Sequence, residues 1–216
     1  MNNNYSRPKP EEYYEIERHE IIDEITIGNH NVLDIGCAKG KTAEIIRSKG
    51  KAKHVVGVEL NAAIGEKAER LFDVLIIGDI EKVEVPTPFG HYDYILAGDV
   101  LEHLVDPWNV LLKMRDALKS DGKIIFSVPN IRNWTVWLPL VLLGRWEYTE
   151  YGILDSTHLR FFTKRTCIDM VKNSDMRIIS IRPAGSRVSR IFNRLGMSFF
   201  EQITAMQFIV VCQRIA

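Results

Sequence analysis

The chain has 216 residues, 46% of them hydrophobic and 26% charged, which is long enough for one domain with a sizeable core. Its 28 basic and 28 acidic residues cancel, so no global field is available to recruit nucleic acid or an acidic surface. No apolar run is long enough to span a bilayer, and the polar residues 1–5 predict no signal peptide. Three widely spaced cysteines, Cys37, Cys167 and Cys212, predict reduced thiols in a cytoplasmic protein.

Apolar runs and helical patterns alternate through the first 130 residues. A charged helix is expected at residues 11–27, and the next elements alternate between strand and helix. The expected strands are residues 31–35, 55–59, 73–77, 92–97 and 123–128, and the expected helices are residues 41–49, a segment ending near 71, and 106–118. This alternation predicts an α/β protein with a doubly wound, mostly parallel sheet.

The alternation ends past residue 130, where residues 131–162 are aromatic and irregular. A helix at residues 164–174 and two strands at 176–181 and 205–213 complete a sheet of seven strands. We therefore expect a single domain over residues 1–216. Its additions are a helical extension at residues 1–29 and cap insertions at 131–162 and 185–204.

A glycine-bearing turn follows the first expected strand. Residues 34–40 read D-I-G-C-A-K-G, and glycine lets the backbone approach a ligand closely because it has no Cβ. The helix that follows directs its free N–H groups toward the same place. Glu59 ends the second expected strand, where an acid can accept hydrogen bonds from both hydroxyls of a ribose. The sequence therefore predicts a nucleotide-like ligand at these strand ends.

The turn departs from two common phosphate-binding patterns. In G-x-G-x-x-G, the second and third glycines would stand where this chain has Ala38 and Lys41. A P-loop needs a glycine five residues before Gly40, where Ile35 stands. A nicotinamide-dependent oxidoreductase on the same sheet is therefore disfavoured, although it stays open as an alternative.

The acid-x-G-x-x-x-G form resembles motif I of the class I S-adenosylmethionine (SAM)-dependent methyltransferases, with Ala38 in place of the family's middle glycine. G-D-I at residues 78–80, D-V-L-E-H at 99–103 and L-K-S-D-G-K at 118–123 resemble later motifs of this family in the same order. D-S-T-H-L-R-F-F-T at residues 155–163 is similar to a segment of ubiquinone-pathway O-methyltransferases and of enzymes that modify sugars or natural products.

This resemblance implies a Rossmann-like fold with a helical and aromatic cap after the fifth strand. It also implies SAM as the cofactor of an enzyme that methylates a small molecule. Oxygen is the favoured acceptor atom, because no N-P-P-Y-type motif follows the fourth strand. A non-catalytic SAM-binding module is the second alternative. The cofactor-binding residues that the resemblance implies are Asp34, Gly36, Cys37, Ala38, Gly40, Glu59, Leu60, Asp79, Ile80, Asp99 and Val100.

Two histidines are the candidates for catalysis. His103 stands where a neutral imidazole could deprotonate a substrate hydroxyl, or it could order its loop. His158 could bind or deprotonate the acceptor, or brace the cap through buried hydrogen bonds. Together with Glu102 they could ligate a divalent ion. The sequence nevertheless predicts no metal site, because a separation of 55 residues between two histidines is not a ligand spacing.

Two further segments bear on partners. Five aromatic residues between 133 and 151 surround an apolar run, and they predict either a lid over an acceptor pocket, a patch that touches lipid, or a cap buried on the core. Residues 176–200 contain no acid, and their arginines suit an anionic or sugar-linked acceptor, an anionic membrane surface, or a solvated face. We expect no nucleic-acid partner and no transmembrane segment, while peripheral membrane contact and a homodimer stay open. The arginines are Arg177, Arg182, Arg187, Arg190 and Arg194.

Overall fold

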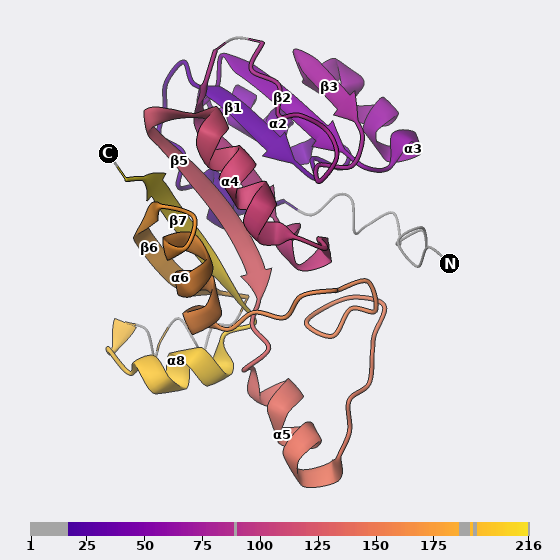
Figure 1. Cartoon of the computed structure of the whole chain (residues 1–216), viewed down its shortest axis with the longest axis vertical. Helices are drawn as coiled ribbons and strands as arrows, with labels where there is room; N and C mark the ends of the chain where they lie inside the picture. The colour runs from indigo at the N-terminus through magenta and orange to yellow at the C-terminus, as the bar shows by residue number, and fades with distance from the viewer. Residues whose placement is uncertain (1–16, 89, 186–190, 192–193, 216) are drawn as a thin grey trace.

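The computed structural model describes residues 17–88, 90–185, 191 and 194–215. Its centre is a seven-stranded sheet with the order β3-β2-β1-β4-β5-β7-β6 (Figure 1). The strands are β1 (Asn31–Ile35), β2 (His54–Glu59), β3 (Val74–Ile77), β4 (Tyr92–Gly98), β5 (Leu118–Pro129), β6 (Met176–Ala184) and β7 (Gln207–Arg214). The first five pair in parallel, and β7 runs antiparallel to both of its neighbours. The predicted doubly wound, mostly parallel sheet is therefore confirmed.

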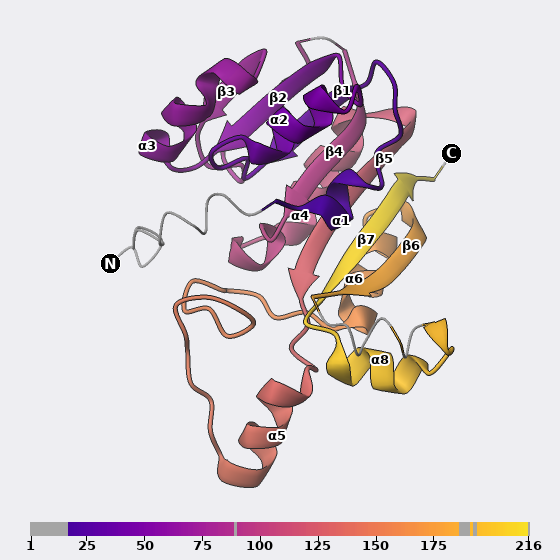
Figure 2. The ribbon, with the colours of Figure 1, turned by 180° about the vertical axis from the view of Figure 1, so that it is seen from behind.

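Helices cover both faces of the sheet. The helices α4 (Pro107–Ala117) and α6 (Lys164–Lys172) lie on the face seen in Figure 1, whereas α1 (His19–Ile22) and α2 (Lys41–Ser48) lie on the face seen in Figure 2. A short α3 (Ala62–Gly65) continues into the 3₁₀ helix η3 (Glu66–Leu71). The helix α1 is shorter than the predicted helix at 11–27, whose residues 11–16 lie outside the described residues.

Two apolar cores result from the alternation of side chains along the strands. In β1, Leu33 and Ile35 pack beneath α4 and α6, while Val32 packs beneath α1 and α2. In β5, Phe126 joins the first core and Ile125 the second. All of these side chains are at most 1% exposed. Because both faces are covered, the parallel strands read as continuous apolar runs rather than as an alternation.

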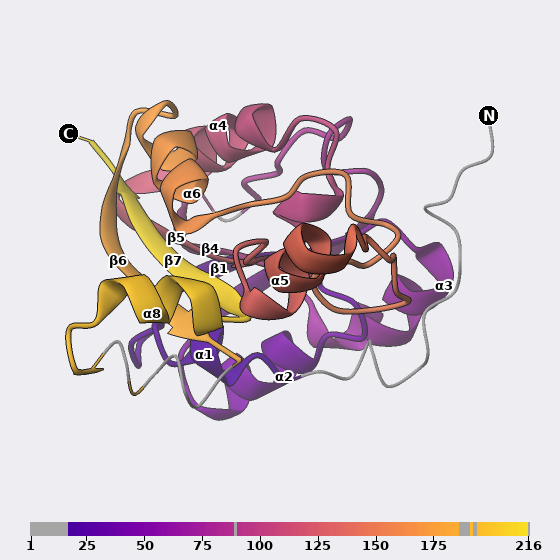
Figure 3. The same ribbon diagram turned by 90° about the horizontal axis from the view of Figure 1, so that it is seen from below.

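Part of the expected cap is helical. The helix α5 (Trp134–Leu143) extends beyond the tip of β5, and the chain returns from it in an irregular segment (Figures 1 and 3). Asn133 begins the helix by accepting a hydrogen bond from Thr135 N, and Gly144 ends it with a φ of +63°. The residue pattern predicts irregular structure here, because a segment that is apolar on every side has no helical period, while the resemblance implied a helical cap. A last helix, α8 (Ser198–Thr204), precedes β7.

Candidate functional site

The turn between β1 and α2 has a backbone that glycine favours. Gly36, Ala38 and Gly40 all have a positive φ, of +69°, +47° and +77°. A Cβ built on Gly36 would lie 2.6 Å from Cγ2 of Val100, so the turn packs tightly against the segment after β4. The structure therefore brings the predicted loop residues and Val100 together at one edge of the sheet.

Asp34 lies beneath this turn and is only 5% exposed. Its Oδ2 atom is buried and has no hydrogen-bond partner among the described residues. Burial raises the pKa of this carboxyl from 3.8 to about 7, Arg18 partly opposes the rise, and the charge of Glu59 adds to it. An unpartnered buried carboxyl oxygen at a strand tip is suited to a cationic or hydrogen-bond-donating group of a ligand.

Glu59 joins the tip of β2 to the same turn. Its Oε2 accepts a hydrogen bond from Ala38 N at 2.9 Å, and its Oε1 accepts one from Asn61 N at 2.8 Å. Each carboxylate oxygen has a second lone pair that can accept from a hydroxyl. Leu60 beside it is 57% exposed, whereas Cys37 is buried, which raises the pKa of its thiol.

The G-D-I segment forms a capped turn. The carboxylate of Asp79 accepts a hydrogen bond from Glu81 N at 3.0 Å and pairs with Lys82 Nζ at 2.8 Å. Burial acts to raise the pKa of Asp79, but these two partners outweigh it and hold the pKa below its usual value. The side chain of Ile80 is 5% exposed and belongs to the core. The adenine-binding role that the resemblance gives to Asp79 and Ile80 stays a prediction.

Asp99, at the tip of β4, is held by two residues that the motifs do not contain. Arg18, 81 residues earlier, forms an ion pair with its Oδ2. Ser127 Oγ donates to its Oδ1 at 2.5 Å, and Asp99 N donates to Ser127 Oγ at 2.9 Å. Burial acts to raise the pKa of Asp99, but Arg18 and Ser127 together lower it below its usual value. No sequence pattern marks Arg18, because a single arginine in a charged helical stretch is ordinary.

His103 and His158 meet at the beginning of the cap. Their ring centroids are 4.7 Å apart with the planes inclined at 70°, and His158 Nε2 lies 4.0 Å from Glu102 Oε1. The backbone N–H groups of Leu159 and Arg160 donate to Glu102 O, at 2.8 and 2.9 Å. These two hydrogen bonds attach the D-S-T-H-L-R segment to the 3₁₀ helix η4 (Leu101–His103).

Glu102 is the most enclosed acid of this region, with 0% of its surface exposed. Neither carboxylate oxygen has a hydrogen-bond partner among the described residues. Burial raises the pKa of Glu102 well above its usual range, and the nearby charge of Asp99 raises it further. Arg160 braces the segment that follows His158. Its Nε donates a hydrogen bond to Val105 O at 3.1 Å, and its guanidinium lies 5.7 Å from the centre of the Trp108 ring.

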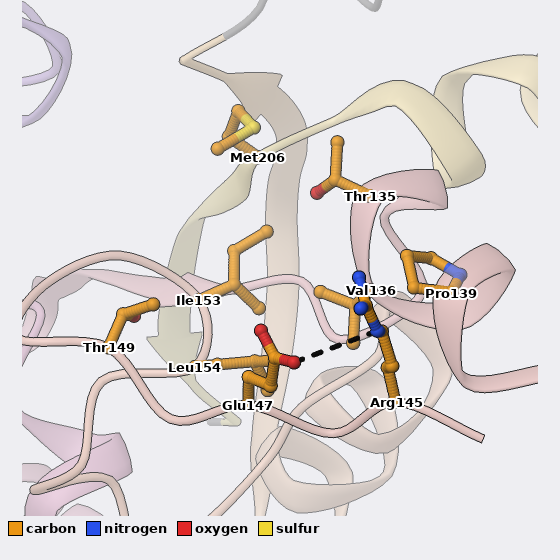
Figure 4. A pocket seen from close by; sticks show the side chains of 9 residues that line it. All are labelled: Thr135, Val136, Pro139, Arg145, Glu147, Thr149, Ile153, Leu154 and Met206. Atoms are coloured by element: carbon orange, nitrogen blue, oxygen red, sulfur yellow. Dashed lines mark ion pairs between the residues drawn. The ribbon is translucent and has the colours of Figure 1, made fainter. Parts of the chain in front are cut away.

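A cavity of about 350 Å³ opens between α5 and the segment that returns from it (Figure 4). Val136 and Pro139 of α5 line one side, and Ile153 lines another. Arg145 and Glu147 of the returning segment also line it and form an ion pair, with Nε and Oε1 3.8 Å apart. Because the carbonyl of Ile153 is 3.0 Å from His158 Nδ1, this wall of the cavity is joined directly to the histidine cluster.

The structure describes the aromatic segment around α5 and part of the arginine-rich stretch at residues 176–200. Of the helix α5 only Val136 is buried, whereas Val141, Leu142 and Leu143 are 67–71% exposed, so the cap does not bury itself on the core. Arg182 pairs with Glu24 Oε1 at 2.7 Å. Two members of the basic stretch, Arg187 and Arg190, lie outside the described residues. No helix in the described part of the chain is long and apolar enough to cross a membrane.

The sequence and the fold were compared with those of known proteins. The chain is 26% identical over 191 residues to a ubiquinone biosynthesis O-methyltransferase of Paraburkholderia xenovorans, covering 85% of this chain and 78% of the relative. A SAM-dependent methyltransferase structure from Archaeoglobus fulgidus superposes with a TM-score of 0.66 at 17% identity, covering 94% of this chain and 97% of that one.

Another structure with this fold has a different activity. The [4+2]-cyclase SpnF superposes with a TM-score of 0.62 at 16% identity, covering 90% of this chain and 79% of that one. The fold alone therefore does not assign methyl transfer. The sequence gives the more specific result, since the methyltransferase domain family matches residues 11–181. The class I methyltransferase fold that the motifs predict is confirmed, and the chain belongs to the methyltransferase domain family.

Proposed function

We propose that the protein transfers a methyl group from SAM to an oxygen atom of a small-molecule acceptor that enters from the cap side. The observation that carries the proposal is the group of strand-tip acids around the β1–α2 turn, above all the unpartnered Asp34 Oδ2. Family membership and the O-methyltransferase relatives agree with it.

The strand-tip residues fit the cofactor in charge and shape. Asp34 offers a buried oxygen to its ammonium group, and Glu59 offers two oxygens to its ribose hydroxyls. The turn requires glycine at position 36, because its φ is positive and a Cβ there would lie 2.6 Å from Cγ2 of Val100. Arg18, already paired with Asp99, supplies a cation near the amino-acid end.

When bound, the cofactor supplies a sulfonium methyl group that is already activated for transfer to a nucleophile. The protein therefore has to align an acceptor oxygen and remove its proton. In the metal-free protein, His103 is the proposed base. Its Nδ1 donates to the carbonyl of Thr157 at 3.3 Å, so the neutral ring carries its lone pair on Nε2. The cavity beside Ile153 is the proposed entry for the acceptor, because the carbonyl of this lining residue is hydrogen-bonded to His158.

Replacing Glu59 by alanine tests cofactor binding. The variant loses both acceptors for the ribose and a bond to Ala38 N, so we expect the affinity for SAM to fall by more than about tenfold. Isothermal titration calorimetry with SAM and with its demethylated product measures this. Glu66→Ala, which removes an exposed acid from η3, is the matched control. Unchanged affinity in Glu59→Ala, or absence of micromolar binding in the wild type, would contradict the proposal.

The acceptor atom needs a second experiment. Transfer of a labelled methyl group is measured against a panel of phenols, sugars, nucleotide sugars and matched amines. Labelled products only from hydroxyl compounds would support O-methylation, and products only from amines would replace it by N-methylation. SAM binding without any labelled product across the panel would favour the non-catalytic module. Displacement of SAM by NAD would favour the oxidoreductase.

A further inference from the structure

The cluster at the beginning of the cap consists of three potential metal ligands. Glu102, His103 and His158 each contribute one donor atom, and these atoms lie within 4.8 Å of one another. Donors about 2.1 Å from a common ion lie about 3.4 Å apart in a tetrahedral site, so small side-chain rotations would bring all three to an ion. The 4.0 Å between His158 Nε2 and Glu102 Oε1 is already close to this separation.

The environment of Glu102 is the independent observation. A carboxylate with 0% exposure and no hydrogen bond to either oxygen among the described residues is rare in a folded protein. Burying such a group costs free energy unless a cation or donors compensate it. A cation that compensates Glu102 comes either from a bound ion or from a protonated His158, whose Nε2 lies 4.0 Å from Glu102 Oε1, and metal titration distinguishes the two.

The orientation of the imidazoles follows from their Nδ1 contacts. A backbone carbonyl only accepts hydrogen bonds, so His158 Nδ1 donates to Ile153 O at 3.0 Å, and His103 Nδ1 donates to Thr157 O at 3.3 Å. In its neutral form, each ring then carries its lone pair on Nε2. Metal-binding histidines typically have this arrangement, with one nitrogen donating to an oxygen and the other bound to the ion.

Thr157 extends this support. Its hydroxyl donates to Asp155 Oδ1 at 2.7 Å and lies 3.1 Å from His103 Nδ1, so it can accept from the histidine. A carboxylate, a hydroxyl and a carbonyl therefore orient the imidazole groups. Such partners fix the ring and raise the basicity of the ligating nitrogen.

We propose that Glu102, His103 and His158 form a binding site for a divalent transition-metal ion such as Zn²⁺, with open coordination positions that take an oxygen of the acceptor. Two imidazoles and one carboxylate suit transition metals, whereas Mg²⁺ and Ca²⁺ prefer oxygen ligands. Three protein ligands leave a position open, as in catalytic rather than structural zinc sites. The metal-binding step stands on its own, while the role for the acceptor rests on the proposed function. With an ion bound, His103 Nε2 is a ligand, and the ion instead of His103 lowers the pKa of the acceptor hydroxyl.

Metal binding is measured directly on the full chain. Protein treated with a chelator is titrated with Zn²⁺, Mn²⁺ or Mg²⁺ by calorimetry, and X-ray absorption reports the donor atoms of the Zn²⁺ form. We expect one Zn²⁺ per chain, two imidazole donors, and weaker binding of Mn²⁺ and then of Mg²⁺. Glu102→Gln and His158→Asn should each weaken Zn²⁺ binding by more than about tenfold. Asn retains a donor for Ile153 O and lacks the Nε2 ligand.

Two further variants separate the site from nonspecific binding. His91→Asn removes an exposed histidine elsewhere on the surface and should leave Zn²⁺ affinity unchanged. Thr157→Val should weaken it about tenfold, because only the orientation of His103 is lost. Glu102→Gln replaces an unpartnered buried acid by a neutral group of the same shape, and near-ultraviolet circular dichroism checks that it folds.

Equal Zn²⁺ affinity in the wild type and in folded Glu102→Gln would overturn the inference, as would the absence of stoichiometric binding. The histidines would then serve only to brace the cap. SAM affinity is measured in the same samples and should not change in Glu102→Gln. Loss of SAM binding in the wild type with intact Zn²⁺ binding would refute the proposed function and leave the metal site standing.

Discussion

Ala38 adopts a left-handed backbone between two glycines that adopt the same one, with φ values of +47°, +69° and +77°. In the left-handed conformation the Cβ of an L-residue lies too close to the following carbonyl oxygen, which costs about 1 kcal/mol of conformational free energy. The glycine that related methyltransferases place here avoids that cost. The turn of this chain therefore carries strain at one residue.

Replacing Ala38 by glycine and Gly36 by alanine should change the stability of the protein in opposite directions. We expect Ala38→Gly to raise the free energy of unfolding by up to about 1 kcal/mol, because it relieves the positive φ. We expect Gly36→Ala to lower it by about 1–3 kcal/mol, because its Cβ would lie 2.6 Å from Val100. Urea denaturation measures both. Destabilisation by Ala38→Gly would show that the backbone at this position is not strained.

Asp34 should make the stability of the ligand-free protein depend on pH. Its pKa is raised to about 7 in the folded chain and is 3.8 ordinarily, so between these values the folded state holds a proton that the unfolded state has released. This contribution to the free energy of unfolding is present in full below pH 4, decreases toward pH 7, and is then constant. Asp34→Asn should therefore match the wild type near pH 4 and exceed it at pH 8.

Denaturation at several pH values checks this, with the exposed Asp116→Asn as the control. The same carboxyl predicts a proton release on cofactor binding at pH 6, because an ammonium group beside Asp34 favours the carboxylate. Calorimetry in buffers of different ionisation enthalpy counts the protons. Equal release by Asp34→Asn and the wild type would assign the proton to another group.

At the scale of elements, Asn133 attaches α5 to the segment between α8 and β7. Asn133 is 1% exposed, accepts from Thr135 N at the start of the helix, and donates through Nδ2 to Ala205 O at 2.8 Å and Thr204 O at 3.2 Å. It therefore caps the helix and also joins it to the segment that leads into β7. Beyond this residue the helix buries only Val136.

Asn133→Ala should weaken this attachment, with a loss of about 1–3 kcal/mol in the free energy of unfolding. Leu142→Gln is the matched control, because Leu142 is 68% exposed and its replacement should change stability by less than about 0.5 kcal/mol. Urea denaturation of both variants measures the difference. A larger loss in Leu142→Gln would mean that the exposed face of α5 is covered by a partner in solution.

At the scale of the whole molecule, the predicted strands and helices can be compared with those of the structure. The strands from β1 to β4 and their helices were predicted within a few residues, because apolar runs of strand length bounded by glycine and proline are local signals. The strand β5 was predicted to start at residue 123 but begins at Leu118. The position of α5 was not predicted from pattern, because a segment that is apolar all round has no period, and only the resemblance implied a helical cap. A ligand-binding turn at residues 34–40 was predicted from its glycines and from Asp34 and Glu59, and its contacts with SAM stay a prediction.

The sequence by itself determined the α/β order and the turn at the end of β1, since both depend on residues that are neighbours along the chain. Only the tertiary structure placed Arg18 on Asp99 across 81 residues, and only it brought His158 beside Glu102 and His103. A separation of 55 residues between the histidines argued against a metal site in the sequence. In the folded chain the two histidines are neighbours in space, because two backbone hydrogen bonds to Glu102 O attach the D-S-T-H-L-R segment directly to η4.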